Sequence, residues 1–306
     1  MKNEKLAPPL NKTRRRIIRT AALLLVATLC TFALMACNAD TQVLCSNHEI
    51  IDPGIAKPHY LNVDGRQVEC WVARSPAAAG GGPKGYVLFF VGQGDRADRY
   101  LTEEAKSWDQ PVEIWGMNYP GAGGSQGPNE IARVGPDALA VYDAVKQIAG
   151  DRPIFVQGGS LGTTAALCVA GARPVDGVIL TNPPPLRQLI IGEYSWWNLG
   201  LISHYIAGQI PVDLDSIANA SRAKAPAVIL SAGADETVPP KYQRMVIDAY
   251  AGPKRVIEMP GRGHEDELTP EAYGKLVAGR DWLWKSAHAS PGASSRPDSP
   301  TSRQAQ

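Results

Sequence analysis

The chain has little net charge, few cysteines and no familiar metal-binding motif. Its 306 residues carry 31 Lys and Arg against 30 Asp and Glu, which leaves a formal net charge of +1. Because dedicated nucleic-acid binders usually show a strong basic excess, we expect no nucleic-acid partner. Five cysteines are too few for a disulfide-built scaffold. Neither H-E-x-x-H nor a paired C-x-x-C occurs, so we predict no metal site and no cofactor.

The N-terminus has the pattern of an export signal. Residues 2–19 hold seven cations and one anion, and Ala21–Met35 is an apolar run of 15 residues. A membrane-spanning helix needs about 20 apolar residues, so the run is typical of a signal peptide. Leu34-Met35-Ala36-Cys37 resembles the lipobox of bacterial lipoproteins. This resemblance implies a signal peptide over 1–36, a lipid on Cys37, and an exported protein anchored to a bacterial membrane, facing the periplasm or the cell exterior.

Alternatives to this export route stay open. Cleavage near Ala36 without lipidation and an uncleaved anchor both fit the pattern. Thr13–Arg19 fits a twin-arginine signal and an ordinary basic region equally well. Removal of 1–36 would leave 24 cations against 29 anions, a formal net charge of −5. In an oxidising compartment, the expected disulfide joins Cys45 and Cys70, and Cys168, within an apolar run, is expected to be a buried thiol.

Apolar runs and helical patterns alternate along the rest of the chain. A hairpin is expected over 60–73 around Asp64-Gly65, followed by strands at 86–91, 112–117, 154–156, 177–180, 227–230 and 255–258. Helices are expected at 136–149, 161–171, 240–251 and 270–286. This order predicts an α/β fold with a mostly parallel sheet and helices on both faces. We expect a tether over 37–58, the folded domain over 59–285, an inserted cap over about 186–222, and a disordered tail over 286–306.

One serine lies in a sharp turn between a strand and a helix. Gly158-Gly159-Ser160-Leu161-Gly162 is a G-x-S-x-G motif, whose small residues allow the strained turn that exposes a nucleophile. Gly123-Gly124-Ser125-Gln126-Gly127 also matches, but it leads into Pro128 with no helix starting at the serine. The context therefore selects Ser160, and Ser125 is interpreted as a loop residue.

A serine nucleophile needs a base and a group that orients the base. Among five histidines, only His264 follows the end of an expected strand. Asp235 follows the strand at 227–230 in the segment Gly233–Pro239. The order Ser160, Asp235, His264 is that of the α/β-hydrolase triad. Over residues 59–285 the chain therefore resembles an α/β-hydrolase family serine hydrolase.

The resemblance implies an oxyanion hole made by the backbone N–H groups of Leu161 and Gln93. Val91 stands where many relatives have histidine. The same loop, Gly92–Ala97, also fits the G-x-G-x-x-A pattern of a dinucleotide site, but the next strand ends in Asn118 where an acidic residue is expected. A dinucleotide-dependent enzyme is therefore a less favoured alternative.

The resemblance implies an acyl-enzyme mechanism on a small-molecule ester or acyl substrate. The expected substrate is a carboxyl ester with an apolar acyl or aromatic group, because the cap contains Tyr194, Trp196 and Trp197. Peptide or thioester cleavage by the same triad is an alternative. A lipid-anchored binding or scaffold protein without chemistry is another, since a fold alone does not establish activity.

Overall fold

The computed structural model describes residues 12–37, 39–45, 47–195 and 200–289, whose strands form one eight-stranded sheet. The strand order is β1-β2-β4-β3-β5-β6-β7-β8. β1 and β2 are antiparallel to each other, β2 is antiparallel to β4, and the strands from β4 to β8 run parallel. The strands are β1 Lys57–Val63, β2 Arg66–Arg74, β3 Gly85–Phe90, β4 Val112–Met117, β5 Ile154–Gly159, β6 Gly177–Thr181, β7 Ala227–Ala232 and β8 Lys254–Met259.

The local sequence explains these strands. Asp64 and Gly65 have φ angles of 51° and 78°, the left-handed pair that a tight hairpin turn between β1 and β2 requires. β4 and β7 are buried along their whole length. Strands buried along their whole length occur where helices cover both faces of a parallel sheet. The predicted mostly parallel sheet is confirmed, with all eight expected strands present.

Ten helices lie in the described residues, and those between β3 and β8 connect the parallel strands. They are α1 Lys12–Cys37, α2 Ala39–Leu44, α3 Ala97–Lys106, α4 Val134–Ala149, α5 Gly162–Ala172, α6 Leu186–Tyr194, α7 Leu201–Gln209, α8 Ser216–Arg222, α9 Pro240–Ala249 and α10 Pro270–Ala289. Short 3₁₀ turns lie at Pro76–Ala78, Ile131–Arg133 and Val212–Leu214. α10 continues to Ala289, beyond the boundary expected for the tail, and residues 290–306 lie outside the described part.

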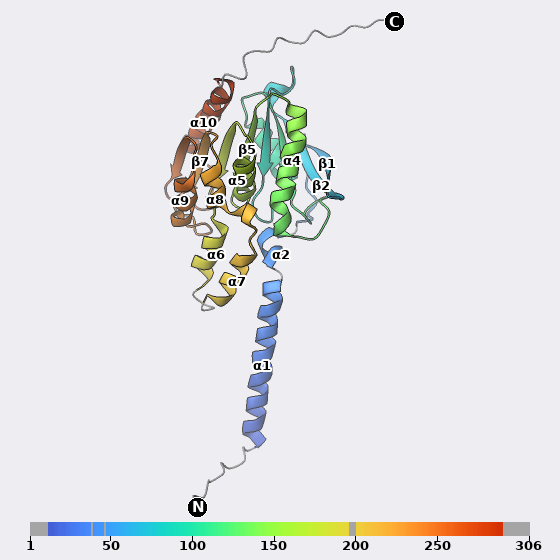
Figure 1. Ribbon diagram of the computed structural model, residues 1–306, viewed down its shortest axis with the longest axis vertical. Coiled ribbons are helices and arrows are strands. Elements are labelled where there is room, and N and C mark those ends of the chain that lie inside the picture. Colours follow the sequence, from blue (N-terminus) through green and yellow to red (C-terminus); the bar gives the residue numbers. More distant parts are fainter. Residues whose placement is uncertain (1–11, 38, 46, 196–199, 290–306) are drawn as a thin grey trace, which may run out of the picture.

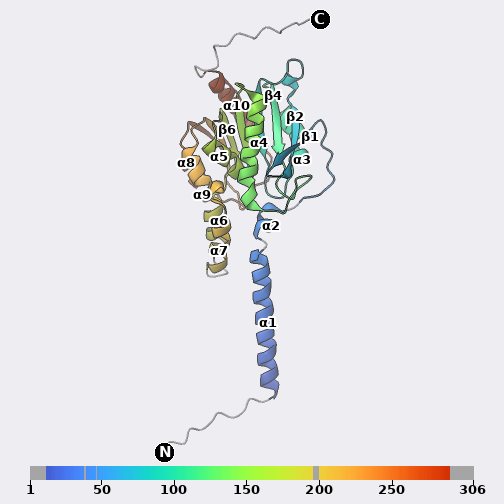
Figure 2. The same cartoon turned by 45° about the vertical axis from the view of Figure 1, so that its right-hand side comes forward.

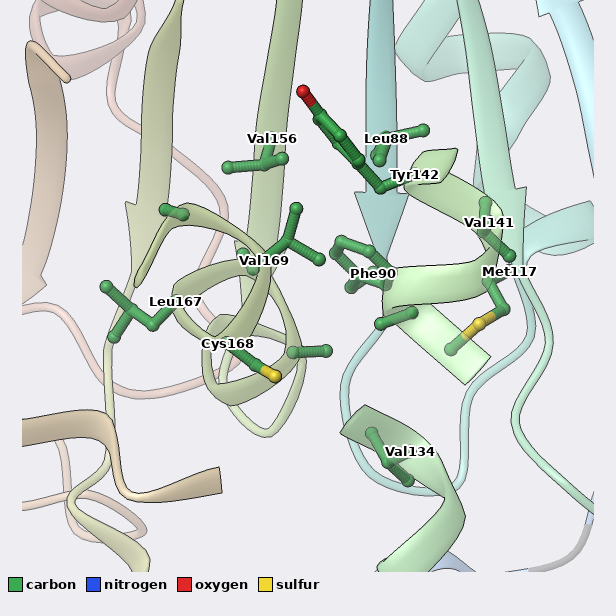
Figure 3. Close-up of a cluster of buried hydrophobic side chains, with 14 of the residues drawn as sticks. Leu88, Phe90, Met117, Val134, Val141, Tyr142, Val156, Leu167, Cys168 and Val169 are labelled. Atoms are coloured by element: carbon green, nitrogen blue, oxygen red, sulfur yellow. The ribbon is translucent and has the colours of Figure 1, made fainter. Parts of the chain in front are cut away.

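The two faces of the sheet carry separate apolar cores. One core joins the sheet to α4, α5, α8 and α9, and the other joins it to α3 and α10. Figure 3 shows part of the first core, where Val169 of α5 and Val141 of α4 flank Phe90 of β3. Both faces of the sheet are thus covered, and the carboxyl ends of the parallel strands are left to carry the site.

The helices that do not cover the faces of the sheet lie at one end of the molecule. α1 extends from the body next to α2, and α6 and α7 project from the same end (Figures 1 and 2). In the described residues, no helix is both long enough and apolar enough to span a bilayer. The expected cap corresponds to α6 and α7, whereas α8 packs on α5 and contributes Ala220 to the core.

The expected Cys45–Cys70 disulfide is wrong. Cys70 is a free thiol, fully buried on β2 within the first core, and burial raises its pKa well above the usual range. Cys45 lies elsewhere, next to the side chain of Gln93. Cys168 is a buried thiol on α5, as expected, and burial raises its pKa to about 12. A thiol that stays protonated behaves as a small apolar side chain.

Candidate active site

Ser160 occupies a strained turn between β5 and α5. Its φ angle is 48°, an uncommon value for a residue with a side chain. A Cβ on Gly158 would come within 2.3 Å of the Gly162 carbonyl oxygen, and one on Gly162 within 2.1 Å of the Phe90 carbonyl oxygen. Only glycine fits at both positions, so the flanking glycines allow the turn that raises the serine hydroxyl above the sheet.

The structure brings together the three residues selected from the sequence. His264 Nε2 lies 2.9 Å from Ser160 Oγ, and His264 Nδ1 lies 2.7 Å from Asp235 Oδ2. Ser160 follows β5, Asp235 follows β7 and His264 follows β8, so three strand ends of the sheet supply the set. Asp235 is 3% exposed, and the His264 side chain is 9% exposed.

N–H groups surround the Asp235 carboxylate. Oδ1 accepts from the backbone N–H groups of Thr237 at 2.9 Å and Val238 at 2.7 Å. Oδ2 accepts from Gln243 Nε2 at 3.0 Å, in addition to His264 Nδ1. Hydrogen bonds from several N–H donors stabilise a carboxylate and fix its orientation. Gln243, on α9, was not identified from the sequence, because a glutamine in an amphipathic helix gives no signal of this role.

This arrangement determines which histidine nitrogen accepts a proton. Since the Asp235 carboxylate acts as acceptor toward its neighbours, His264 Nδ1 carries the hydrogen. In a neutral imidazole the other nitrogen, Nε2, is then an acceptor, and it faces the Ser160 hydroxyl. His264 is therefore oriented to remove the serine proton, as a general base does in acyl transfer.

Asn182 is a second residue that the sequence did not reveal. It follows β6, has a φ angle of 51° and is 3% exposed. Its Oδ1 accepts from the Ala232 N–H at 2.9 Å, and its Nδ2 donates to the His264 carbonyl oxygen at 3.2 Å. Asn182 thus ties the end of β7 to the loop that carries the histidine.

The expected oxyanion donors lie next to the nucleophile. Leu161 is the first residue after Ser160 and precedes α5, whose N-terminus carries a partial positive charge. Gln93 and Leu161 line the same apolar cavity as Ser160. Placement therefore agrees with an oxyanion hole at this point, although the role of each N–H stays a prediction.

The glycine-rich loop is not free to cradle a dinucleotide. The Gly94 N–H donates to the Leu44 carbonyl oxygen at 3.0 Å, and the Ala97 N–H donates to Asn118 Oδ1 at 2.7 Å. A pyrophosphate site needs such N–H groups for the ligand. The protein's own acceptors take them here, which argues against the dinucleotide alternative.

Ser125 is a structural residue of the loop after β4. Its Oγ donates to the Asn118 carbonyl oxygen at 2.8 Å and accepts from the Glu69 N–H at 2.9 Å. Both bonds are buried, and they fasten this loop to β2. The structure therefore gives the second G-x-S-x-G motif a structural role and leaves Ser160 as the nucleophile candidate.

Two cavities meet at Ser160. The first has a volume of about 290 Å³ and runs beneath the cap; its aliphatic lining is Val43, Leu161, Leu186, Leu189, Ile190, Ile202, Ile206 and Val238. The second has a volume of about 340 Å³ and a more polar lining that includes Asp95, Tyr100, Asn182 and Glu265. Ser160, Gln93 and Thr237 line both. The nucleophile thus stands between an apolar and a polar compartment.

Some of the predicted positions cannot be placed in this geometry. Trp196 and Trp197 lie outside the described residues, and the side chains of Tyr194 and Cys37 are not described either. The described cap surface facing Ser160 is aliphatic, with its side chains supplied by α6 and α7. Among the described residues, no cluster of His, Cys, Asp and Glu could hold a metal ion.

Solved structures resemble this architecture. Est1E from Butyrivibrio proteoclasticus matches with a TM-score of 0.59 and 16% identity, covering 75% of this chain and 98% of that one. The monoacylglycerol lipase of Paleococcus ferrophilus matches with a TM-score of 0.51 and 20% identity, covering 71% and 99%. The chain has the α/β-hydrolase fold. This confirms the fold class that the motifs implied.

Sequence relatives are distant. No family model matches the chain. An uncharacterized protein of Mycobacterium tuberculosis is 26% identical over 229 residues, which cover 73% of this chain and 77% of that protein. A lysophosphatidylserine lipase of Danio rerio is 28% identical over 171 residues, which cover 50% of this chain and 42% of that protein. A monoglyceride lipase of Mus musculus is 29% identical over 136 residues, which cover 41% of this chain and 42% of that protein.

Proposed function

We propose that this α/β-hydrolase is a serine esterase that cleaves the carboxyl ester of a lipid with one acyl chain and an uncharged, hydroxyl-bearing alcohol. The observation that carries the proposal is the position of Ser160, hydrogen-bonded to His264 at the junction of an apolar and a polar cavity. Distant sequence similarity to two lipases supports the class of reaction.

The reaction follows from the roles of the three residues. Ser160 Oγ attacks the ester carbonyl carbon while His264 Nε2 takes the hydroxyl proton, and Asp235 stabilises the imidazolium. The N–H groups of Leu161 and Gln93 stabilise the oxyanion of the tetrahedral intermediate. His264 then gives the proton to the departing alcohol, which leaves an acyl group on Ser160. Water, activated by His264, releases the acid and regenerates the serine.

The two cavities suggest which part of the ester lies on each side. The aliphatic cavity beneath the cap suits the acyl chain, since each buried methylene contributes about 0.8 kcal/mol. The polar cavity then receives the alcohol. Its lining contains the carboxylates of Asp95 and Glu265, and no Lys or Arg among the described residues. Such a lining repels a phosphate and favours a neutral alcohol such as glycerol.

A pair of substrates with the same acyl chain tests this choice. We expect a higher kcat/KM for a monoacylglycerol than for the matching lysophosphatidylserine. Asp95→Asn combined with Glu265→Gln removes the repulsion of the phosphate, so the ratio of kcat/KM for monoacylglycerol to kcat/KM for lysophosphatidylserine should fall. The fall should be only about two- to fivefold, because both carboxylates lie near solvent, where charges are screened. Glu267→Gln, on the same loop but outside the cavity lining, serves as the control. Preference for the anionic lipid in the wild type would contradict this substrate class.

We also propose that the protein is exported and anchored through a lipid on Cys37. The basic residues, apolar run and lipobox-like segment support this proposal. Val43 already lines the apolar cavity, only six residues after Cys37. Six residues span at most about 20 Å, so an anchor at Cys37 would hold the cavity close to the bilayer surface. α6 and α7 project at the same end as α2 (Figure 2).

A further inference from the structure

The segment after Cys37 enters the folded body almost at once. Part of the segment expected to be a tether over 37–58 contacts the folded body: Leu44 is 3% exposed and belongs to the first core, and Val43 lines the apolar cavity beside Ser160. We call α2 together with Cys45 and Asn47 the α2 segment. Several of its contacts lie on the loop Gly92–Asp95, which is far from it in sequence.

Both backbone polar groups of Gly94 are bound by the α2 segment. The Gly94 N–H donates to the Leu44 carbonyl oxygen at 3.0 Å, and the Gly94 carbonyl oxygen accepts from Asn47 Nδ2 at 2.9 Å. Gly94 has a φ angle of 71°, and a Cβ there would lie 3.4 Å from Cys45 Cβ. The side chain of Gln93 also reaches this segment, with Nε2 at 3.4 Å from Cys45 Sγ.

A further bond fixes the peptide plane that carries the Gln93 N–H. The Gly92 carbonyl oxygen, which belongs to that plane, accepts from the Asp95 N–H at 3.4 Å. With Gly94 held from outside and Gly92 held within the turn, the planes on both sides of Gln93 are restrained. An oxyanion donor must be preorganised in this way to act in the transition state.

Asn47 is itself held in place. Its Oδ1 accepts from the Glu49 N–H at 3.0 Å, and its carbonyl oxygen accepts from the Gly123 N–H at 3.0 Å. Asn47 therefore bridges the Gln93 loop and the loop after β4. The α2 segment also contributes Val43 to the wall of the apolar cavity.

We propose that Leu44 and Asn47 are positioning residues that hold the Gln93 N–H in register with the Leu161 N–H. This inference rests on the proposed esterase function, because it assigns a role to the oxyanion loop. The segment next to the membrane anchor would then be part of the catalytic apparatus. Enzyme that lacks it would retain Ser160, His264 and Asp235 but lose transition-state stabilisation.

Asn47→Asp tests the proposal with little change of shape. The aspartate keeps an acceptor for the Glu49 N–H but cannot donate to the Gly94 carbonyl oxygen. Asn47→Ala removes the donor without adding charge. Asn62→Asp is the matched control, since Asn62 Oδ1 accepts from the Gly65 N–H in the β1–β2 turn, away from the site.

The measurement is kcat for a short soluble ester, divided by the number of sites that a fluorophosphonate titrates. Both Asn47 variants should lose about 10-fold or more in kcat per titrated site with KM changed less than about threefold, because a displaced oxyanion donor weakens only the transition state. Asn62→Asp should match the wild type. Wild-type kcat per site in the Asn47 variants, with a lowered Tm, would overturn the proposal and leave a structural role only.

Hydrogen exchange at the Gly94 amide separates this inference from the esterase proposal. In both Asn47 variants this amide should exchange at least about 10-fold faster than in the wild type, whatever the catalytic activity. Unchanged exchange would show that Asn47 does not hold the loop. The wild type could instead show the expected exchange result but neither react with the fluorophosphonate nor hydrolyse esters. That outcome would overturn the esterase function and leave the restraint on the loop intact.

Discussion

Gln243 Nε2 donates to Asp235 Oδ2 over 3.0 Å, and the same oxygen accepts from His264 Nδ1 over 2.7 Å. Gln243 is fully buried on α9, and its Nε2 also donates to the Val238 carbonyl oxygen at 2.7 Å. One amide group therefore links the carboxylate that orients the histidine to the loop after β7. We therefore expect Gln243 to influence the position of His264 through Asp235.

Gln243→Leu should lower kcat about 10-fold. Asp235 Oδ2 would lose the hydrogen bond from Gln243 Nε2, so the carboxylate could rotate away from His264. Stability should also fall by about 1.5–3 kcal/mol, the usual cost of losing a buried hydrogen bond to a charged group. Ester turnover per titrated site and thermal unfolding measure the two effects separately.

Gln110→Leu is the control for this prediction. Gln110 is also a buried glutamine that donates to an aspartate oxygen, Asp281 Oδ1, but it lies on the far side of the sheet from α9. Gln110→Leu should lower Tm without changing kcat per titrated active site. Equal kcat values for the two variants would show that Gln243 has no part in positioning Asp235.

Ile206→Trp should shorten the apolar cavity beneath the cap, which we propose holds the acyl chain. Ile206 lines it from α7, and a larger side chain there would exclude the distal methylenes of a chain. Since each buried methylene contributes about 0.8 kcal/mol, excluding two should reduce kcat/KM about 10-fold or more for an octanoate ester and little for an acetate. Ile148→Trp, at an exposed position on α4, should leave both values unchanged. A uniform loss for both esters would indicate that the chain lies elsewhere.

A flexible insertion tests the link between anchor and substrate. Twenty Gly/Ser residues between Asn38 and Ala39 add a mean reach of about 25 Å while leaving α2 in place. For the lipid-anchored enzyme, hydrolysis of monoacylglycerol in the same vesicles should fall severalfold, and turnover of a soluble ester should not change. The same insertion after Ala289 is the control. If the two insertion variants hydrolysed monoacylglycerol in vesicles at equal rates, the proposed proximity of the cavity to the bilayer would be contradicted.

The sequence predicted the parts of this site that depend on local pattern and chain order. Six strands follow from apolar runs and two from the hairpin around Asp64-Gly65, and Ser160 was separated from Ser125 by the helix that starts after it. Asp235 and His264 were chosen because each follows an expected strand and because the order Ser160, Asp235, His264 is that of the α/β-hydrolase triad. The structure places these three residues within hydrogen-bonding distance.

Other parts depend on contacts between distant segments and give no local signal. The six residues of α2 are too few to show a periodicity, and Asn47 bonds to a glycine 47 positions away. Asn182 resembles a turn residue until its two bonds across the sheet end are seen. The disulfide between Cys45 and Cys70 was wrong because pairing by compartment and count ignores that Cys70 lies within a strand of the core.

The central claim is that Ser160 is the nucleophile of a serine hydrolase. A fluorophosphonate applied to protein starting at Ala39 should form one covalent adduct, on the peptide that carries Ser160, as mass spectrometry would show. Ser160→Ala should abolish the adduct and reduce kcat by about 10⁴- to 10⁶-fold, whereas Ser125→Ala, in the other G-x-S-x-G motif, should still label at Ser160. Wild-type turnover in Ser160→Ala, or an adduct elsewhere, would contradict the account.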